Sequence, residues 1–359
     1  MTSRQRLIIA SKHEMPDRVP VAPFSLGQLG TELPYRKGAF PKNPLAKELI
    51  EKTDILIPVH GVRFEHEILA GKAEVEQKTD GDVTTFRMST PQGDLVWKKQ
   101  KTVETSVMIE FPFKTPEDFE RFCSIPYELP QIHLEDYQYW RETLGEEGLV
   151  LMQVGDALCF PAGWFAPEVF CMLCADRPQL IGRMVEMAAE RVNHYAEALC
   201  KGGVDFFQVI GGEYATVQLG PRGFEKWVKP FDKTLIGKIH AHGARVFYHN
   251  HGRVMRYLDD FMEMGVDVLE PVEAPPGGDM DFKAAMKKTR GRMTLSGNLD
   301  DMEVLGRLEE EEIKSLARAI LSQTGGNGHI LGGTTSAMFE EKTARNFIAL
   351  AEMVREIEG

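Results

Sequence analysis

The sequence predicts an α/β protein, a (β/α)8 TIM barrel with a β-meander inserted after the second strand. Short apolar runs typical of strands alternate with amphipathic helices through the second half of the chain, and glycines follow most of these helices. Together with three upstream runs, the strand candidates number eight, which is the number that closes such a barrel. An open doubly wound sheet is the alternative, although no G-x-G-x-x-G motif follows any of the strands.

Each strand in the second half is followed by a helix with apolar residues spaced by three and four positions. The first of these helices begins near Pro178 and ends at Gly202-Gly203, and the four glutamates at 309–312 favour a helix N-terminus because of the helix dipole. The strand candidates are residues 18–25, 54–59, 148–154, 204–210, 244–249, 266–269, 292–296 and 328–331. Further helices are expected over 224–242 and 254–264, before Gly291, from about 309 to Gly325-Gly326, and over 339–357.

An insertion of residues 61–147 separates the second and third strands. Asp80-Gly81 and Gly93-Asp94 lie between runs that alternate in polarity, which is the pattern of a β-meander. Thr115-Pro116-Glu117-Asp118 then has the features of a helix N-terminus, with Thr as cap and Pro in the first turn. We expect one domain over residues 1–359, in which the insertion is a lid or a dimer element.

Charge and composition exclude several classes of protein. The 42 Lys and Arg against 54 Asp and Glu leave a net charge of −12, which is the wrong sign for a nucleic-acid partner. No run approaches the roughly 20 apolar residues of a membrane helix, and residues 1–18 do not resemble a signal peptide. The five cysteines are typical of a reducing compartment, so we expect a cytoplasmic protein. Cys171 and Cys174 are interpreted as part of a buried helix.

The C-terminal ends of barrel strands carry the functional groups. His249 and His251 end the fifth strand, and alternate residues of an extended segment share a face, so both imidazoles can meet one ion. Glu213, Glu270 and Glu273 follow neighbouring strands. Two imidazoles with one or two carboxylates are typical of a site for zinc or a similar divalent metal, with the histidines, Glu270 and Glu273 as candidate ligands. The alternative is that one imidazole binds a nearby loop and the other faces solvent.

Other residues at strand ends are candidates for the same barrel mouth. We assign His60 and Tyr214 to catalysis together with Glu213. The aromatic residues among the candidates offer apolar walls for an aromatic substrate, although such residues are more often part of the core. The candidate substrate-binding residues are Phe24, Tyr248, Asn298 and Asp300.

Four stretches resemble, in this order, sequences of one known superfamily, that of uroporphyrinogen decarboxylase, whose members are (β/α)8 barrels. Together they span about residues 15–350. They are Asp17-Arg18-Val19-Pro20-Val21, Val154-Gly155-Asp156-Ala157, Pro221-Arg222-Gly223-Phe224 with Pro230, and Leu295-Ser296-Gly297-Asn298-Leu299-Asp300, which is similar to the G-N-x-D signature of the superfamily.

The resemblance implies one of two activities, of which the first is tetrapyrrole decarboxylation. Decarboxylases of the superfamily have an arginine-rich loop after the first strand, an Asp after the second and a late His. Here residues 25–31 contain no arginine, the second strand ends at Val59-His60, and Thr334-Thr335 occupies the late turn. A porphyrinogen with eight carboxylates would also meet the acidic mouth, in which each close pair of like charges costs a few kcal/mol. Decarboxylation is therefore the alternative prediction.

The second activity is methyl transfer with corrinoid proteins. That branch has an H-x-C-G zinc motif and a later cysteine ligand, whereas this chain has His249-Asn250-His251-Gly252 and no cysteine beyond Cys200. A His/Glu site is harder and more electrophilic than a thiolate site, which disfavours a thiol acceptor. We expect a metal-dependent methyltransferase acting between a small methoxylated or N-methylated substrate and a separate corrinoid (cobalamin) protein, because the chain has no D-x-H-x-x-G corrinoid motif.

The oligomeric state and a third kind of function complete these expectations. The protein is expected to be a monomer or a homodimer. A barrel with another metal-dependent reaction, or a non-catalytic binder, is the third alternative.

Overall fold

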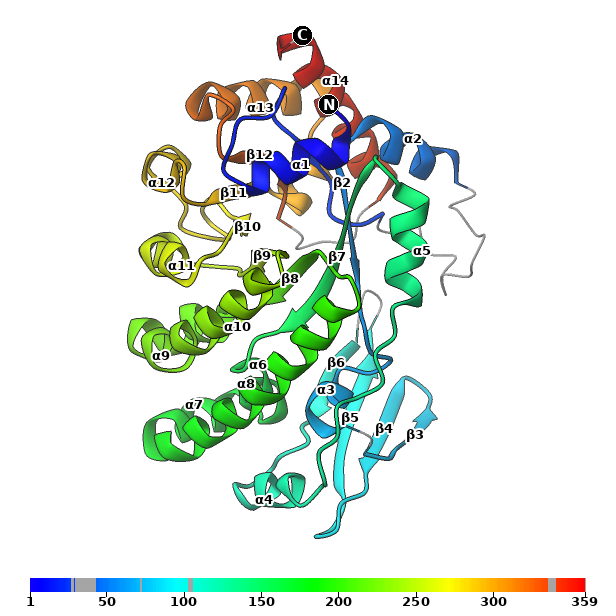
Figure 1. Cartoon of the computed structure of the whole chain (residues 1–359), viewed down its shortest axis with the longest axis vertical. Helices are drawn as coiled ribbons and strands as arrows, with labels where there is room; N and C mark the ends of the chain where they lie inside the picture. The colour runs from blue at the N-terminus through cyan, green and yellow to red at the C-terminus, as the bar shows by residue number, and fades with distance from the viewer. Residues whose placement is uncertain (27–28, 30–42, 72, 103–105, 335–339, 359) are drawn as a thin grey trace.

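The chain folds into a parallel β-barrel surrounded by helices (Figure 1). The computed structural model describes residues 1–26, 29, 43–71, 73–102, 106–334 and 340–358. Its larger sheet has the strand order β1-β12-β11-β10-β9-β8-β7-β2. Phe24, just beyond β1, bridges Leu56 of β2, which joins the two end strands and confirms the predicted barrel. The strands are β1 (Val21–Ala22), β2 (Ile55–Val59), β7 (Gly148–Gly155), β8 (Phe206–Ile210), β9 (Arg245–His249), β10 (Val268–Val272), β11 (Thr294–Leu299) and β12 (His329–Gly333).

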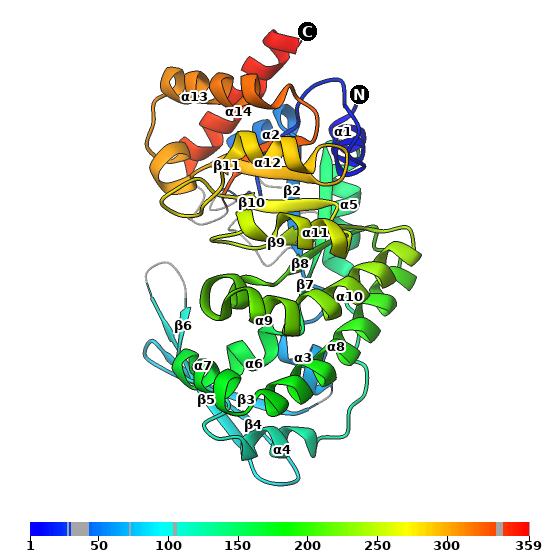
Figure 2. The ribbon, with the colours of Figure 1, turned by 90° about the vertical axis from the view of Figure 1, so that its left-hand side faces the viewer.

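Helices cover the outside of the barrel, and most begin and end near the predicted positions (Figure 2). The acidic N-terminus predicted at 309–312 is a capping box formed by Glu309 and Glu312. The α-helices are α1 (Ser3–Ser11), α2 (Pro44–Lys52), α3 (His66–Ala70), α4 (Glu117–Cys123), α5 (Glu135–Leu144), α6 (Cys159–Trp164), α7 (Pro167–Asp176), α8 (Pro178–Lys201), α9 (Gly220–Trp227), α10 (Lys229–Ala241), α11 (Leu258–Met264), α12 (Phe282–Thr289), α13 (Glu310–Thr324) and α14 (Glu341–Glu358). Short π and 3-10 segments are η2 (Tyr214–Leu219), η3 (Met255–Tyr257) and η4 (Asp301–Leu305).

Three helix predictions need correction. The single helix expected over 224–242 is two, α9 and α10, which meet at Val228 because Pro230 has no N–H and is accommodated only in a first turn. The helix expected over 254–264 opens with the 3-10 turn η3. Thr115 does not cap α4: the Asp118 carboxylate instead accepts the N–H groups of Lys114 and Thr115.

The insertion forms a second sheet, as predicted. Its strands are β3 (Val75–Asp80), β4 (Val83–Met88), β5 (Leu95–Lys101) and β6 (Ser106–Glu110), all antiparallel and in sequence order. This meander and α4 lie at the end of the molecule remote from both chain termini (Figure 1). Its role as a lid or a dimer element stays a prediction.

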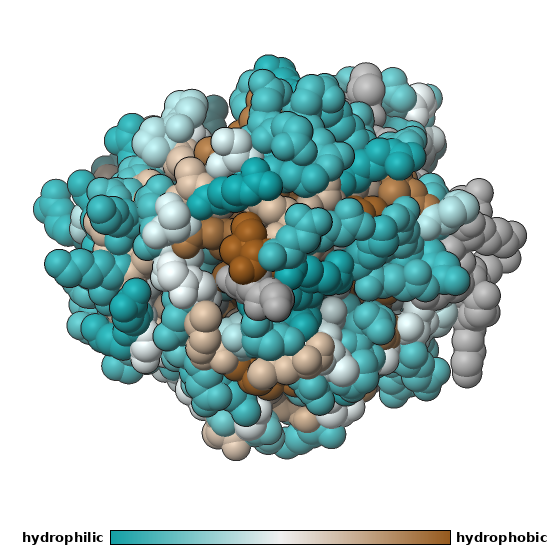
Figure 3. Space-filling view, turned by 90° about the horizontal axis from the view of Figure 1, so that it is seen from above, coloured by the Kyte–Doolittle hydropathy of each residue, from teal (hydrophilic) through white to brown (hydrophobic). Residues whose placement is uncertain are grey.

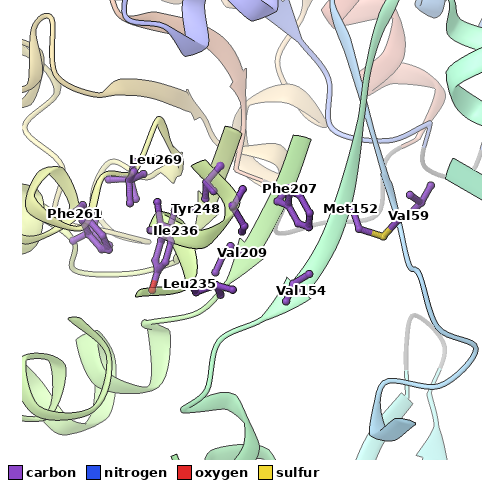
Figure 4. Packing of buried hydrophobic residues seen from close by; sticks show 14 of the residues in the cluster. Val59, Met152, Val154, Phe207, Val209, Leu235, Ile236, Tyr248, Phe261 and Leu269 are labelled. Atoms are coloured by element: carbon purple, nitrogen blue, oxygen red, sulfur yellow. The ribbon is translucent and has the colours of Figure 1, made fainter. Parts of the chain in front are cut away.

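Apolar residues pack in two layers, one on each side of the barrel wall. Outside, the strands pack against the helices, as Val209, Tyr248, Ile236 and Phe261 illustrate (Figure 4). Cys174 of α7 belongs to this outer layer, which confirms its interpretation as a core residue. The interior layer is smaller and includes Leu7 and Ala10 of α1; its strand members are Ala22, Leu56, Leu149, Leu151, Phe206, Phe247, Val268 and Ile330. The apolar interior is therefore closed off by the N-terminal helix.

The polarity of the molecular surface agrees with the charged composition of the chain. The end that carries both termini is mainly hydrophilic, with small hydrophobic areas between polar side chains (Figure 3). No helix in the described ranges is long and apolar enough to cross a membrane.

Candidate functional site

A polar layer lies directly above the apolar interior, toward the C-terminal ends of the strands. Side chains alternate along a strand, so the residues two positions beyond Leu151, Phe206, Phe247 and Val268 face the same interior. Those residues are Gln153, Gln208, His249 and Glu270. The barrel thus changes from apolar to polar at its mouth, where (β/α)8 proteins place their functional groups.

These four polar residues are connected by hydrogen bonds. The Gln153 amide donates to Oε1 of Gln208 at 2.5 Å, and the Gln208 amide donates to Oε1 of Glu270 at 2.6 Å. Nδ1 of His249 lies 3.0 and 3.1 Å from the two carboxylate oxygens of Glu270. The pairing follows from the register of the sheet, in which Glu270 of β10 lies opposite His249 of β9.

His251 forms a second imidazole–carboxylate pair. Its Nδ1 lies 3.0 Å from Oε1 of Glu273, and the other oxygen of Glu273 accepts the N–H of Gly252 at 2.8 Å. Burial favours the neutral imidazole, but the hydrogen bond and charge of Glu273 outweigh burial and raise the pKa of His251. Burial likewise opposes the ionised form of Glu273, and the hydrogen bonds from His251 and Gly252 overcome it, so the pKa of Glu273 is lowered. Glu273 therefore stabilises the protonated form of His251 relative to an isolated imidazole.

The two imidazoles lie close together, and each is bound to a carboxylate through its Nδ1. Their ring centroids are 4.7 Å apart and the rings are nearly perpendicular. A carboxylate only accepts hydrogen bonds, so in the neutral form each Nδ1 carries the hydrogen and each Nε2 carries the free lone pair. Both side chains are partly exposed, at 15% for His249 and 24% for His251. Two nitrogen donors are thus available at the mouth.

The donor types fit a divalent metal of the zinc class. Metal-binding histidines commonly donate their other ring N–H to a carboxylate, which is the place that Glu270 and Glu273 occupy here. In the described part of the chain, however, no three His, Cys, Asp or Glu side chains are grouped to hold an ion. The structure therefore brings together two candidate ligands, His249 and His251, and places the two glutamates behind them.

The residues assigned to catalysis differ in their surroundings and in their relation to His249 and His251. Glu213, exposed at the start of η2, is close enough for its charge to contribute to the raised pKa of His251. Tyr214 is half-buried, and its ring contacts that of Phe170 in α7. His60 is exposed just beyond β2. Only Glu213 is thereby connected to the histidines.

Tyr248 needs correction as a substrate-binding residue. It alternates with His249, so its side chain leaves the opposite face of β9 and lies between the sheet and the helices (Figure 4). It is 0% exposed, and its hydroxyl donates to the buried Asp232 of α10. Burial and the charge of Asp232 raise the pKa of Tyr248, so the hydroxyl keeps its proton. Tyr248 is a core residue and does not line the mouth.

The other substrate-binding candidates occupy the interior or its rim. Phe24 packs against the interior apolar layer. Asn298 is half-buried on β11 with a φ of 92°, and its side-chain oxygen has no hydrogen-bond partner among the described residues. Asp300 caps η4 by accepting the N–H groups of Met302 and Glu303. Of these, Asn298 has an unused polar group to offer a ligand.

Sequence reasoning missed Gln153 and Gln208. Each is a single amide within an otherwise apolar strand, at a position that alternation places inside the barrel. That interruption of an apolar run was the available signal. Two sequence comparisons with decarboxylases fall partly outside the described residues, namely the loop at 25–31 and the turn at Thr334-Thr335.

The fold and site define a (β/α)8 barrel with a polar, histidine-bearing mouth, and sequence comparison gives its family. Residues 99–357 match the family described as uroporphyrinogen decarboxylase (URO-D). The chain therefore belongs to the URO-D family, which confirms the resemblance predicted from its motifs.

Individual relatives are distant. The chain is 24% identical over 161 residues to uroporphyrinogen decarboxylase of Synechococcus sp. (strain JA-2-3B'a(2-13)), and the match covers 43% of this chain and 42% of the relative. A second Synechococcus decarboxylase, of strain JA-3-3Ab, is 23% identical over 165 residues, 44% of this chain and 41% of its own. The matched segment thus spans about two fifths of the curated relatives.

Solved structures share the fold over longer stretches. A methyltransferase from Methanosarcina mazei matches with a TM-score of 0.69 and 18% identity, covering 100% of both chains. A B12-independent methionine synthase from Shewanella sp. W3-18-1 matches with a TM-score of 0.51 and 12% identity, covering 73% of this chain and 75% of that one. At these identities the likeness establishes the fold.

Proposed function

We propose that this protein is a metal-dependent methyltransferase that moves a methyl group between a small methoxylated or N-methylated substrate and a corrinoid carried by a separate protein. The observation that carries the proposal is the pair of imidazoles at the end of β9, each with its Nδ1 bound by a glutamate and its Nε2 without a hydrogen-bond partner among the described residues. The full-length fold match to a methyltransferase is compatible with this class of reaction.

His249 and His251 would hold the metal, and a divalent ion bound there supplies Lewis acidity to a substrate heteroatom. Glu270 and Glu273 keep the hydrogen of each neutral imidazole on Nδ1. A corrinoid on the partner protein would supply the electron pair for the new bond to the methyl carbon, and the heteroatom would keep the pair of the bond that breaks. Of the residues assigned to catalysis, Glu213 is the one whose charge reaches His251.

The charges at the mouth favour this proposal over porphyrinogen decarboxylation. Glu213 is exposed and its charge reaches His251, whereas Glu270 and Glu273 lie behind the histidines. A substrate with eight carboxylates would have to bring its charges against Glu213, and a like-charge contact at about 4 Å costs about 4 kcal/mol at an intermediate dielectric. A neutral or cationic methylated substrate has no such cost.

An anaerobic assay tests the proposal. The zinc-loaded protein is mixed with reduced cobalamin and, in turn, a methoxylated phenol and an N-methylated amine, and formation of the methylated corrinoid is followed by its absorbance. We expect zinc-dependent methyl transfer from one of these substrates and at least a roughly 100-fold loss in His249→Ala. Metal-independent turnover of uroporphyrinogen, without methyl transfer, would contradict the proposal.

A further inference from the structure

The Glu270 carboxylate is held by one amide and one imidazole. It is 3% exposed, and the hydrogen-bond donors that the described residues offer it are Gln208 and His249. Gln208 is itself 1% exposed and lies directly above Phe206, the interior apolar residue on the same face of β8. A buried amide of this kind persists only where its hydrogen bonds are made.

The orientation of the Gln208 amide is determined by its neighbour on β7. Gln153 lies opposite Gln208 in the parallel register and donates to its oxygen, so the nitrogen of Gln208 faces Glu270. The hydrogen bond to a charged acceptor is of the stronger kind. It leaves the Glu270 carboxylate directed at Nδ1 of His249, which lies 3.4 Å from the same amide nitrogen.

The geometry points to Gln208 as a positioning residue: through Glu270, it keeps the hydrogen of His249 on Nδ1 and the lone pair of Nε2 toward the mouth, and Gln153 orients Gln208. This inference deepens the proposed function, because it explains how β8, next to β9, and β7 beyond it prepare His249 for a metal. Without the Gln208 amide, His249 is the one hydrogen-bond donor to the Glu270 carboxylate among the described residues. The carboxylate is then free to rotate about its terminal C–C bond.

The consequence for metal binding follows from known behaviour of such outer hydrogen bonds. Changing the group behind a metal-binding histidine typically lowers metal affinity by about 10- to 100-fold. We expect a loss of that size for Gln208→Met, which preserves the length of the side chain and removes its donor. Gln153→Met leaves Gln208 in place but unoriented, so its loss is expected to be smaller.

The experiment uses the full chain without substrate. Nitrogen-15 spectra of histidine-labelled protein, recorded at about pH 8 where an ordinary imidazole is neutral, report which ring nitrogen of His249 carries the hydrogen. The His249 signals are assigned by their loss in His249→Gln. Zinc affinity is measured by titration calorimetry on the same variants, and Gln323→Met, at an exposed position on α13, is the control.

We expect the Nδ1–H form in the wild type and the control, a mixture of both forms in Gln208→Met, and the corresponding loss of zinc affinity. If Gln208→Met does not fold, Gln208→Asn, whose amide is too short to reach Glu270, serves in its place. The inference would be overturned if Gln208→Met kept the wild-type tautomer and a zinc affinity within about twofold of wild type, while Glu270→Gln changed both. Absence of methyl transfer, with the tautomer as expected, would instead refute the proposed function alone.

Discussion

His329 should make the stability of this protein fall steeply in mild acid. The residue is 1% exposed on β12, with its ring edge-on to that of Phe282 at 4.8 Å between centroids. Nε2 lies 3.4 Å from the carbonyl oxygen of Gly297, whereas Nδ1 has no partner among the described residues. Burial lowers the pKa of His329 to about 4, and the contact with the Gly297 carbonyl offsets only part of this effect. Protonation would therefore place an unpaired charge in the core.

The size of the effect follows from the two pKa values. An unfolded chain has an ordinary histidine pKa of about 6.5, so between pH 6.5 and 4 the unfolded state binds a proton at this residue that the native state does not. Stability is therefore lost as the pH falls through this window. The gap of about 2.5 pH units corresponds to about 3.4 kcal/mol when complete, and about 2 kcal/mol is already lost at pH 5.

Urea unfolding of the wild type and His329→Gln at about pH 7.5 and pH 5 measures this contribution. We expect the free energy of unfolding of the wild type to fall by about 2 kcal/mol more than that of the variant, because other titrating groups act equally on both. His194→Gln, at an exposed position on α8, is the control and should follow the wild type. Parallel profiles of the wild type and His329→Gln, within about 0.5 kcal/mol, would refute the reasoning.

Two further predictions concern the region behind the histidines. Tyr248→Phe leaves the buried carboxyl of Asp232 without its hydroxyl donor, so the free energy of unfolding should drop by about 1–3 kcal/mol while the substrate KM is unchanged. A raised KM would indicate instead that Tyr248 lines the mouth. Gly211→Ala should lower the free energy of unfolding in urea by about 1–3 kcal/mol, because the new Cβ would lie 2.4 Å from the side chain of Asp156. Gly182→Ala, in open space on α8, should raise it by about 0.5–1 kcal/mol. Equal effects of the two substitutions would contradict this packing.

The barrel was predictable because its signals are local. Apolar runs follow helix-ending glycines through the second half of the chain, three upstream runs bring the number to eight, and chain order alone then predicts the wall of the barrel. The break at Val228 was also predictable, since Pro230 is accommodated only in the first turn of a helix and therefore indicates that a new helix begins just before it.

The site was predictable in part for a similar reason. Alternation along β9 correctly places His249 and His251 together. The same rule turns Tyr248 to the other face and Gln208 to the interior, so both could have been assigned from the sequence. That Glu270 binds Nδ1 of His249 could not, because it depends on the register between β9 and β10, which only the closed sheet determines.

The metal content of anaerobically purified protein, measured for the wild type beside His249→Ala, tests the central claim most directly. The account predicts about one zinc or similar divalent ion per chain in the wild type and its loss in the variant, because His249 supplies one of two neighbouring imidazole ligands. A wild-type protein that holds no metal even after zinc is supplied would contradict the account.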